Sequence, residues 1–575
     1  MTESRWKQGR ALPRMVCGAL TVLLSLAVAG CRRQQAPAVV GQGADALVGG
    51  SVEHTRNAQV ARYTIQPRSA AQLRVDFGPT TGYGLRTWTL HAAAGQPATI
   101  LVAGMRGDTT YHMQAVAQFA DGTVVRDADH TFTTGHYKSH MIPKITAESF
   151  GTPQPGVELL NPAIGHWYEA IVTDLQGHVL WAYDYSDRES STMVQMHKDL
   201  HSVYLMLSGW LHGNFHPHAW VPTSKTRRFG TIINPIKPLP NGDFLMVISL
   251  GSHELLDSPD GAPPPDTTLA LREVNLEGDT VRNMTIQQLN DRLRAHGYQG
   301  PTLEMMHHDV EVLPNGHMIV LTNATRDYRN LPGYPGTTRV IGDILVDLDP
   351  QWQPGWTWSE FDHLSVDRHP KDFPDWTHSN AVIYTKDDGN LIVSSRTQSW
   401  VMKIDYRNGQ GTGKIVWTLG KDGDLRLING QAPQDWNYGQ HNPQIFGDRD
   451  AGVFDIGMMD NGYGRILADG KMCGTKGAGP CYTTVPIFRI DEAAKTATLV
   501  FHKVFPPKQY SYWGGAVQDL PNGNVQIDLC SQGDDSDVWE VTRMIDPQSV
   551  WHMHVEGTND YRTERLGSLY PGVTW

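Results

Sequence analysis

Residues 375–396 read DWTHSNAVIYTKDDGNLIVSSR and predict a β-hairpin with polar residues at its mouth. An apolar strand follows Asn380, an aspartate-rich turn reverses the chain, and a second apolar strand returns to Arg396. Because successive side chains of a strand point to opposite faces, alternation places His378, Asn380 and Val382 on one face. The hairpin is therefore expected to bring a histidine, an amide and a guanidinium together.

Similar hairpins recur along the chain. His308 precedes a segment that ends in the turn Pro314-Asn315-Gly316, and His441 opens another strand-like segment. Asn-Gly and Asp-Gly between apolar strands are strong hairpin signals, and such turns stand at 240–242, 314–316, 387–389 and 521–523. Aromatic strands, expected at the outer edges of successive sheets, lie at 179–183, 355–358 and 415–418. Repeated four-stranded antiparallel sheets predict an all-β fold, with a β-propeller of about six blades over residues 136–575 and one helix at 285–296.

Three histidines stand at equivalent places in these repeats. The start of each innermost strand of a propeller lines its central channel, so His308, His378 and His441 are expected to face one cavity. Since a shift of one residue in register exchanges the faces of a strand, His307 competes with His308 for the inward position.

The groups that accompany these histidines separate two kinds of site. Arg396 would repel a metal cation, whereas Arg396 and the amide of Asn380 suit a tetrahedral oxyanion. A neutral imidazole can attack such a centre, and further histidines can donate or accept protons near neutral pH. The pattern favours an anion site without a metal or other cofactor.

Length and composition limit the function classes. A chain of 575 residues is expected to hold more than one domain. A net charge of −12 with 19% charged residues argues against nucleic acid as the main partner, and 17 tryptophans with 57 glycines suit turn-rich β structure. Short alternating strands over 51–135 predict a β-sandwich. It resembles a fibronectin type III domain, with Trp88 in the core and Tyr111 at a corner.

The first thirty residues have the character of an export signal. Basic residues before Arg14 precede the apolar run Val16–Ala29, and the run ends at Leu26-Ala27-Val28-Ala29-Gly30-Cys31. This ending resembles a bacterial lipoprotein lipobox, in which Cys31 would carry lipid; the alternative is an ordinary signal peptide cut nearby. Either form predicts export to the periplasm or cell envelope, with residues 31–50 as a flexible tether.

The remaining cysteines suit an oxidising compartment. Cys473 and Cys481 share one glycine-rich loop and form the natural disulfide pair. Their spacing also allows metal binding, but no second Cys/His pair is spaced to match, which favours a structural bridge. Cys530 lies in an apolar strand and is expected to be a buried thiol. A separate cluster could bind metal, although Gly213 and Pro217 within it indicate a loop. Its members are His212, His216 and His218.

Four segments carry a family resemblance. HHDVEVLPNG, DWTHSNAV with its following SSR, GQHNP and MMDNG resemble the bacterial arylsulfate sulfotransferases, and the similarity spans essentially the whole mature chain. The resemblance implies a six-bladed propeller preceded by a β-sandwich, and a homodimer. It also implies transfer of a sulfuryl group from a phenolic sulfate ester to another phenol, without the nucleotide donor (PAPS-independent), by a ping-pong route through sulfohistidine.

The same resemblance implies roles for single residues. His441 would be the nucleophile, and His308, His378, Asn380 and Arg396 would surround the sulfuryl oxygens. His308 or His378 would protonate the leaving phenolate and later deprotonate the acceptor. The family has a disulfide near its active site. In this chain that disulfide would be the bridge between Cys473 and Cys481. Candidate substrate-lining aromatics, each with core packing as its alternative, are Tyr438, Tyr510, Tyr512 and Trp513.

Other functions are weighed against this expectation. A sulfatase is disfavoured because no cysteine stands in a Cys-x-Pro-x-Arg motif, and nucleotide-dependent sulfotransfer because no glycine-rich phosphate loop opens a helix. A metal-dependent propeller hydrolase or lyase remains an alternative. So does a surface-anchored propeller that binds a ligand without catalysis, because the fold alone does not specify function.

Overall fold

A computed structural model describes residues 46–163, 167–184, 232–249, 269–450 and 452–575. Strands make up nearly all the regular structure of these residues, which confirms the expected all-β class. The described helices are α3 (Ile286–Ala295), α4 (Glu360–His363) and the 3₁₀ turns η1 (Ser139–Met141) and η3 (Pro507–Gln509).

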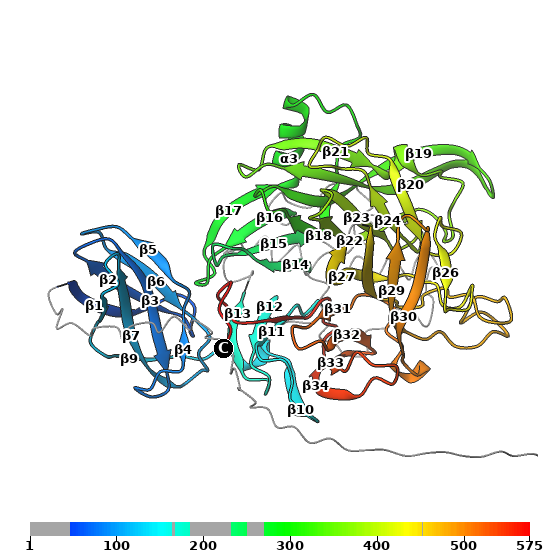
Figure 1. Cartoon of the computed structure of the whole chain (residues 1–575). Helices are drawn as coiled ribbons and strands as arrows, with labels where there is room; N and C mark the ends of the chain where they lie inside the picture. Colours follow the sequence, from blue (N-terminus) through cyan, green and yellow to red (C-terminus); the bar gives the residue numbers. More distant parts are fainter. Residues whose placement is uncertain (1–45, 164–166, 185–231, 250–268, 451) are drawn as a thin grey trace, which may run out of the picture.

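The N-terminal strands form two sheets that pack face to face, drawn in blue in Figure 1. One sheet contains β1 (Leu47–His54), β2 (Ala61–Pro67) and β6 (Ala98–Val102). The other contains β3 (Ala71–Gly78), β4 (Leu85–Arg86), β5 (Leu90–Ala92), β7 (Thr110–Phe119), β8 (Val124–Arg126) and β9 (His130–Thr133). In β2 every second side chain is buried, the alternation of a strand with one face on a core. The first strand begins within the stretch expected to be a tether.

Trp88 does not fill the sandwich core as the resemblance to a fibronectin type III domain implied. The residue lies between β4 and β5, and its ring packs against Tyr570, with ring centroids 6.2 Å apart. A Cβ on Gly242 would lie 2.1 Å from the same indole, so Trp88 covers the turn at that glycine. It therefore links the sandwich to the rest of the chain instead of filling the sandwich core. Tyr111 meets the expectation of a corner residue, since its hydroxyl accepts the backbone N–H of Arg106 at 3.0 Å.

The remaining strands described by the structure form six sheets. The first two sheets contain β11 (Val157–Leu160), β12 (Ala170–Thr173), β13 (Val179–Tyr183) and β35 (Glu564–Leu566), then β14 (Ile232–Pro238), β15 (Phe244–Ser249), β16 (Ala270–Val274) and β17 (Thr280–Thr285). The next two contain β18 (Met305–Val312), β19 (Met318–Leu331), β20 (Tyr334–Leu348) and β21 (Pro354–Ser359), then β22 (Ser379–Thr385), β23 (Asn390–Ser395), β24 (Trp400–Ile404) and β25 (Ile415–Leu419).

The last two sheets have five strands each. One contains β26 (Arg426–Ile428), β27 (His441–Asp450), β28 (Val453–Met459), β29 (Thr484–Asp491) and β30 (Thr496–Val504), and the other contains β10 (Lys144–Ser149), β31 (Ala516–Asp519), β32 (Val525–Gln532), β33 (Asp535–Val541) and β34 (Ser549–Glu556). All pairs in the six sheets are antiparallel except β26 with β30. β35, near the C-terminus, pairs with β11, so the first of these sheets joins distant parts of the chain.

The predicted turns are confirmed. Each of the four glycine turns connects an edge strand of a sheet to the strand that pairs with it, and Gly242, Gly316, Gly389 and Gly523 all have positive φ. The predicted aromatic strands are β13, β21 and β25, which all lie at the edge of a sheet. The predicted helix is α3, where Thr285 and Gln288 form a reciprocal capping box.

Successive sheets pack face to face, and their cores lie between them. One core joins Leu345 of β20 to Leu391 of β23, and another joins Trp417 of β25 to Phe488 of β29. We call six edge strands, one from each sheet, the first strands: β14, β18, β22, β27, β31 and β35. They contact one another in that order, and Figure 1 shows the sheets following each other in chain order from green to red. A cavity of about 670 Å³ is lined by β14, β18, β22 and β27 together with Arg562 and Glu564. Four of these strands, with Glu564 of β35, therefore face one cavity.

Some sequence expectations lie outside the described residues: the signal segment 1–30, Cys31 and the cluster at residues 212–218. Across the described ranges, the search for a helix of sufficient length and apolarity to traverse a bilayer finds none.

Candidate functional site

The three predicted histidines stand at irregular points of the first strands. His308 lies within β18, His378 directly precedes β22, and His441 is the first residue of β27. The strand register shifts at all three places, as in β-bulges. Positive φ angles accompany the shifts, 55° at His308, 50° at His378 and 44° at Asn442. Non-glycine residues rarely adopt this conformation, and strain of this kind gathers at functional sites.

The bulges change which side chains share a face. The shift between Ser379 and Ala381 interrupts the alternation, so the prediction that His378, Asn380 and Val382 lie on one face is wrong. His378 remains partly exposed, whereas Asn380 is fully buried. Asn380 Nδ2 donates to the carbonyl oxygen of Gln440 at 2.7 Å, which places this amide behind His441.

Tyr561 joins the histidines into one cluster. The rings of His308 and His378 have centroids 4.7 Å apart, and the Tyr561 ring lies 5.9 Å from that of His308 and 6.1 Å from that of His441. Tyr561 comes from the segment before β35. The structure thus brings together the three histidines that the repeat spacing selected.

Hydrogen bonds fix the tautomer of His441. Asn461 Nδ2 donates to the carbonyl oxygens of Ser511 and Gly514, at 2.8 and 3.0 Å, so Asn461 Oδ1 must face the histidine as an acceptor. This oxygen lies 2.7 Å from His441 Nδ1, which therefore carries the proton of the neutral ring. Nε2 is unprotonated, and its lone pair accepts the backbone N–H of Gly514 at 3.3 Å.

Two of the histidines are neutral at ordinary pH. Burial lowers the pKa of His441 well below its usual value of 6.5, and the positive charge of Arg396 lowers it further. Burial also lowers the pKa of His308 well below 6.5, with the neighbouring His378 as the next cause. A neutral imidazole with an unprotonated Nε2 is a competent nucleophile once the hydrogen bond from Gly514 to this nitrogen is broken.

Acidic partners distinguish the other two histidines. His378 Nδ1 lies 2.6 Å from Asp375 Oδ2, so this ring has a carboxylate to stabilise its positive charge after protonation. His307 Nε2 lies 3.2 Å from Asp343 Oδ1, and its Nδ1 lies 2.8 Å from His308 Nδ1. His308 thus faces His378 in the cluster, and His307 supports it from behind.

Arg396 carries an uncompensated charge. Its backbone N–H donates to the carbonyl oxygen of His378 at 3.2 Å, which holds it at the hairpin mouth. No described residue makes a hydrogen bond or ion pair with its guanidinium, and its Nε is buried without a partner. A guanidinium in this state is ready to receive an anion in fork geometry.

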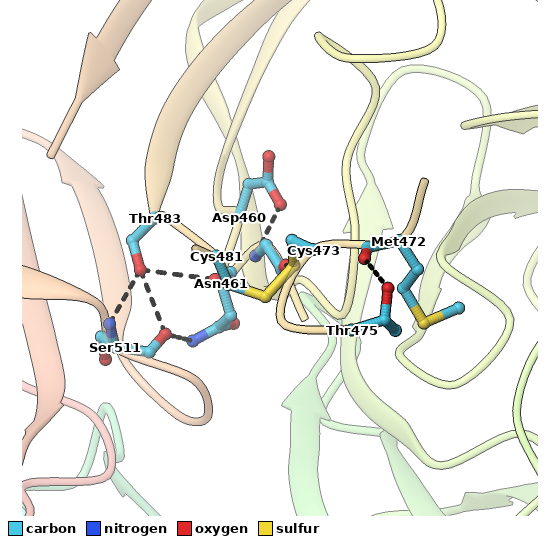
Figure 2. The surroundings of a disulfide bond; sticks show 9 residues. Asp460, Asn461, Met472, Cys473, Thr475, Cys481, Thr483 and Ser511 are labelled. Atoms are coloured by element: carbon cyan, nitrogen blue, oxygen red, sulfur yellow. Dashed lines mark hydrogen bonds between the residues drawn. A yellow bond between two sulfur atoms is a disulfide. The ribbon is translucent and has the colours of Figure 1, made fainter. Parts of the chain in front are cut away.

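The predicted disulfide is present. Cys473 and Cys481 are bonded, and Cys473 Sγ lies 3.4 Å from the carbonyl oxygen of Gly462. Figure 2 shows the bridge beside Asn461, and Thr483 Oγ1 donates to the Asn461 carbonyl oxygen at 3.3 Å. Thr483, which follows the disulfide loop, therefore connects that loop to Asn461, the residue that orients His441. The predicted buried thiol of Cys530 is also confirmed.

The predicted aromatic residues divide into two groups. Tyr510, Tyr512 and Trp513 form a chain of neighbouring rings that continues to Tyr561, the Trp513 and Tyr561 centroids being 6.2 Å apart. Tyr438 belongs to a hydrophobic core and donates to the carbonyl oxygen of Pro433, so core packing holds for this residue.

Several residues of the cluster escaped the sequence reasoning. They are Asp375, Asn461, Tyr463, Gly514 and Tyr561. Asn461 stands in the MMDNG segment, and Asp375 opens the hairpin segment, so both lay in sequences already singled out. Nothing in the pattern around Tyr463 or Tyr561 marked them. Among the described residues, no group of three or more His, Cys, Asp or Glu side chains is arranged to hold a metal ion.

Comparison with known proteins identifies the family. The model of the family Arylsulfotransferase (ASST) matches residues 163–562, which is most of the chain. The chain belongs to the arylsulfotransferase family. The match includes all three histidines of the cluster, Arg396 and Tyr561. Membership supports a sulfuryl-transferring enzyme in general terms. No curated protein matches the chain.

Solved structures resemble this arylsulfotransferase-family chain only distantly. A provisionally assigned 6-phosphogluconolactonase from Bacteroides fragilis is 9% identical with a TM-score of 0.32, and the match covers 86% of this chain and 98% of that one. A duf4221 family member from Bacteroides vulgatus is 8% identical with a TM-score of 0.30, covering 74% and 98%. The NanB sialidase from Streptococcus pneumoniae is 8% identical with a TM-score of 0.23, covering 89% and 94%. These scores are too low to carry an argument.

Proposed function

We propose that this protein transfers a sulfuryl group from a phenolic sulfate ester to a phenolic acceptor by a ping-pong route through a sulfohistidine at His441. The observation that carries the proposal is the neutral His441 ring, whose Nδ1–H is held by Asn461 while Nε2 keeps its lone pair. The unpaired guanidinium of Arg396 and the family match support the same reaction.

The first half-reaction forms the covalent intermediate. The lone pair of His441 Nε2 forms the N–S bond, while the bond from sulfur to the phenolic oxygen breaks and its electron pair leaves with the phenolate. His378 gives this oxygen a proton, and Asp375 stabilises the ring before the transfer. The transition state is expected to be loose, as in phosphoryl transfer, so charge on the sulfuryl oxygens requires positioned donors such as Arg396.

The second half-reaction reverses the first with a new phenol. The acceptor oxygen forms a bond to sulfur as its proton passes to His378, and the N–S bond breaks to return the lone pair to His441 Nε2. The proton lost in the first half-reaction is thereby restored. The backbone N–H of Gly514 donates to Nε2 at 3.3 Å before the reaction, so attack by Nε2 releases this N–H to donate to an oxygen of the bound group.

We infer that the six sheets are the blades of a propeller with the N-terminal sandwich beside it. The sequential contacts of the first strands, the common cavity and the pairing of β35 with β11 support this architecture. The signal-like segment 1–30 supports export and lipid attachment at Cys31, in the periplasm or cell envelope, and the resemblance supports a homodimer.

The test combines turnover with detection of the intermediate. Purified protein is incubated with a chromogenic aryl sulfate, with and without phenol and in the presence of chelator, and peptides are examined by mass spectrometry. Phenol-dependent turnover that survives chelation, with one sulfuryl group on the peptide containing His441, is the expected result. The variant His441→Gln loses both signals, whereas His91→Gln, a change at an exposed histidine of β5, keeps them.

Other outcomes identify the competing functions. Turnover that chelator abolishes would indicate a metal-dependent hydrolase or lyase. Binding of the aryl sulfate without turnover or label would indicate a propeller that only binds its ligand.

A further inference from the structure

A second cation lies at the edge of the histidine cluster. Lys371 Nζ is 4.2 Å from the centre of the Tyr463 ring, and Arg396 Cζ is 5.3 Å from the same centre. Lys371 comes from the segment between α4 and β22, and Tyr463 from the loop after β28. Tyr463 is 43% exposed, so the shared ring lies at the protein surface above Arg396.

No carboxylate of the described residues forms an ion pair with Lys371 or Arg396, although Asp372 lies near enough to Lys371 to favour its ammonium form. Lys371 makes no hydrogen bond or ion pair with any residue that the structure describes, and the adjacent Asp372 instead accepts the hydroxyl of Tyr334 at 2.6 Å. Burial lowers the pKa of Lys371 to about 8, and the like charge of Arg396 contributes in the same direction. Two unpaired cations around one aromatic ring are costly without an anion between them.

The backbone is shaped to admit the amine. A Cβ at Gly464 would lie 1.8 Å from Lys371 Nζ, and Gly464 has a φ of +78°, so a side chain there would displace the ammonium group. Attraction of Lys371 to the Tyr463 face would by itself explain a purely structural contact. It would leave unexplained why a second positive charge is kept beside Arg396.

We propose that Lys371 and Tyr463 form an outer subsite that binds a second anionic group, such as a carboxylate, on the aromatic ring of the sulfated donor or the phenolic acceptor. The inference rests on the proposed function, in which Arg396 receives the sulfuryl group. Lys371 Nζ and Arg396 Cζ lie 4.2 and 5.3 Å from the centre of the Tyr463 ring, and these two distances limit how far apart the cations can be. A benzene ring with anionic groups at opposite (para) positions can reach both cations across such a separation. The aromatic body of the substrate would then contact Tyr463.

The subsite predicts a pH-dependent preference. The charged groups acting on Lys371 are Arg396, which disfavours its ammonium form, and Asp372, which favours it; the Tyr463 ring covers its Nζ. The ammonium form is present below a pKa of about 8 and is lost above it. Preference for carboxylated substrates should therefore decline between neutral pH and about pH 9, while Arg396 stays charged.

Two donors that differ by one charge test the proposal: 4-carboxyphenyl sulfate and its neutral methyl ester. Lys371→Met is expected to raise KM for the carboxylate about tenfold and to change kcat/KM for the ester by less than about twofold. Lys371→Arg should keep the preference. The control Lys476→Met alters an exposed lysine in the disulfide loop and should change neither donor.

If Lys371→Met lowered kcat/KM equally for both donors, the proposal would be overturned, because Lys371 would then act in sulfuryl binding or folding. If it lowered kcat/KM for neither donor, the proposal would also be overturned, because Lys371 would have no role. Thermal unfolding of each variant identifies a folding defect. If wild-type protein turned over neither donor, the proposed function would fail on its own account. The subsite would then be judged by calorimetric binding of 4-hydroxybenzoate against 4-hydroxybenzamide, and an unchanged affinity ratio in Lys371→Met would refute it.

Discussion

Asn461 determines which nitrogen of His441 can react. The amide is held by two backbone carbonyl oxygens, so its own oxygen has one orientation and the histidine proton has one place. His307 has a comparable relation to His308, because its contact with Asp343 leaves Nδ1 to face the next ring. Two histidines of the cluster, His441 and His308, are thus positioned by neighbouring side chains.

Replacement of Asn461 tests this positioning. Asn461→Leu removes the acceptor for His441 Nδ1–H, so the proton can move to Nε2, and kcat is expected to fall on the order of 100-fold with little change in KM. Asn461→Asp keeps an acceptor and should retain more activity than the leucine variant. Single-turnover formation of sulfohistidine measures the effect, and equal activity of the two variants would contradict the assigned role.

The pH profile tests the charge of Arg396. Burial and then the positive charge of Arg396 disfavour the imidazolium of His441, so protonation of this ring should slow sulfohistidine formation in wild-type protein only below pH 6.5. Arg396→Gln removes this charge, so the acid limb should move upward in pH, whereas Arg396→Lys should leave it near its wild-type position. An acid limb that stays in place in the glutamine variant would show that Arg396 does not act on His441.

At the scale of elements, the loop between β28 and β29 links the disulfide to the site. Its start is held by a buried ion pair, because Arg465 and Asp460 lie 2.6 Å apart and are each almost fully buried. Asp460 also accepts the backbone N–H groups of Tyr438 and Gly462, directly beside Asn461. The orientation of Asn461 therefore depends on a buried charge pair.

Arg465→Leu would leave Asp460 buried without its partner. Loss of one member of such a pair costs about 3–5 kcal/mol, so the midpoint of chemical denaturation should fall clearly. Arg489→Leu is the matched control, because this guanidinium is exposed and its partner Asp455 keeps a second cation in Arg543, so the change should cost less than about 1 kcal/mol. Equal destabilisation by the two changes would show that burial does not govern the contribution of the Arg465 pair.

At the scale of the whole molecule, the sequence predicted features that local chemistry determines. Glycine turns, edge strands rich in aromatics and the helix expected at 285–296 depend on neighbours close in the chain, and all were confirmed. The bulge at Ser379 was missed because a register shift depends on pairing with β23. Trp88 was placed in a core because its contact, Tyr570, lies almost at the other end of the sequence.

Separation along the sequence also explains which residues of the site could be predicted. The histidines occur in recurring hairpins, and their repetition made them visible. Tyr561 and Lys371 occur once each, in loops without a repeating pattern, and only the folded chain brings them to the histidines or to Arg396. Spacing therefore predicted the reactive groups better than their surroundings.

The contact between Asp309 and Arg562 joins residues 253 positions apart. Ribosomes add about 5–20 residues per second, so roughly 10–50 seconds separate the synthesis of Asp309 from that of Arg562. Until the residues around Arg562 are synthesised, the cluster of His308, His378 and His441 lacks Tyr561, and β11 lacks its partner strand β35. A growing chain therefore cannot complete this cluster before Tyr561 is added, so any activity that needs the whole cluster is expected only near the end of synthesis.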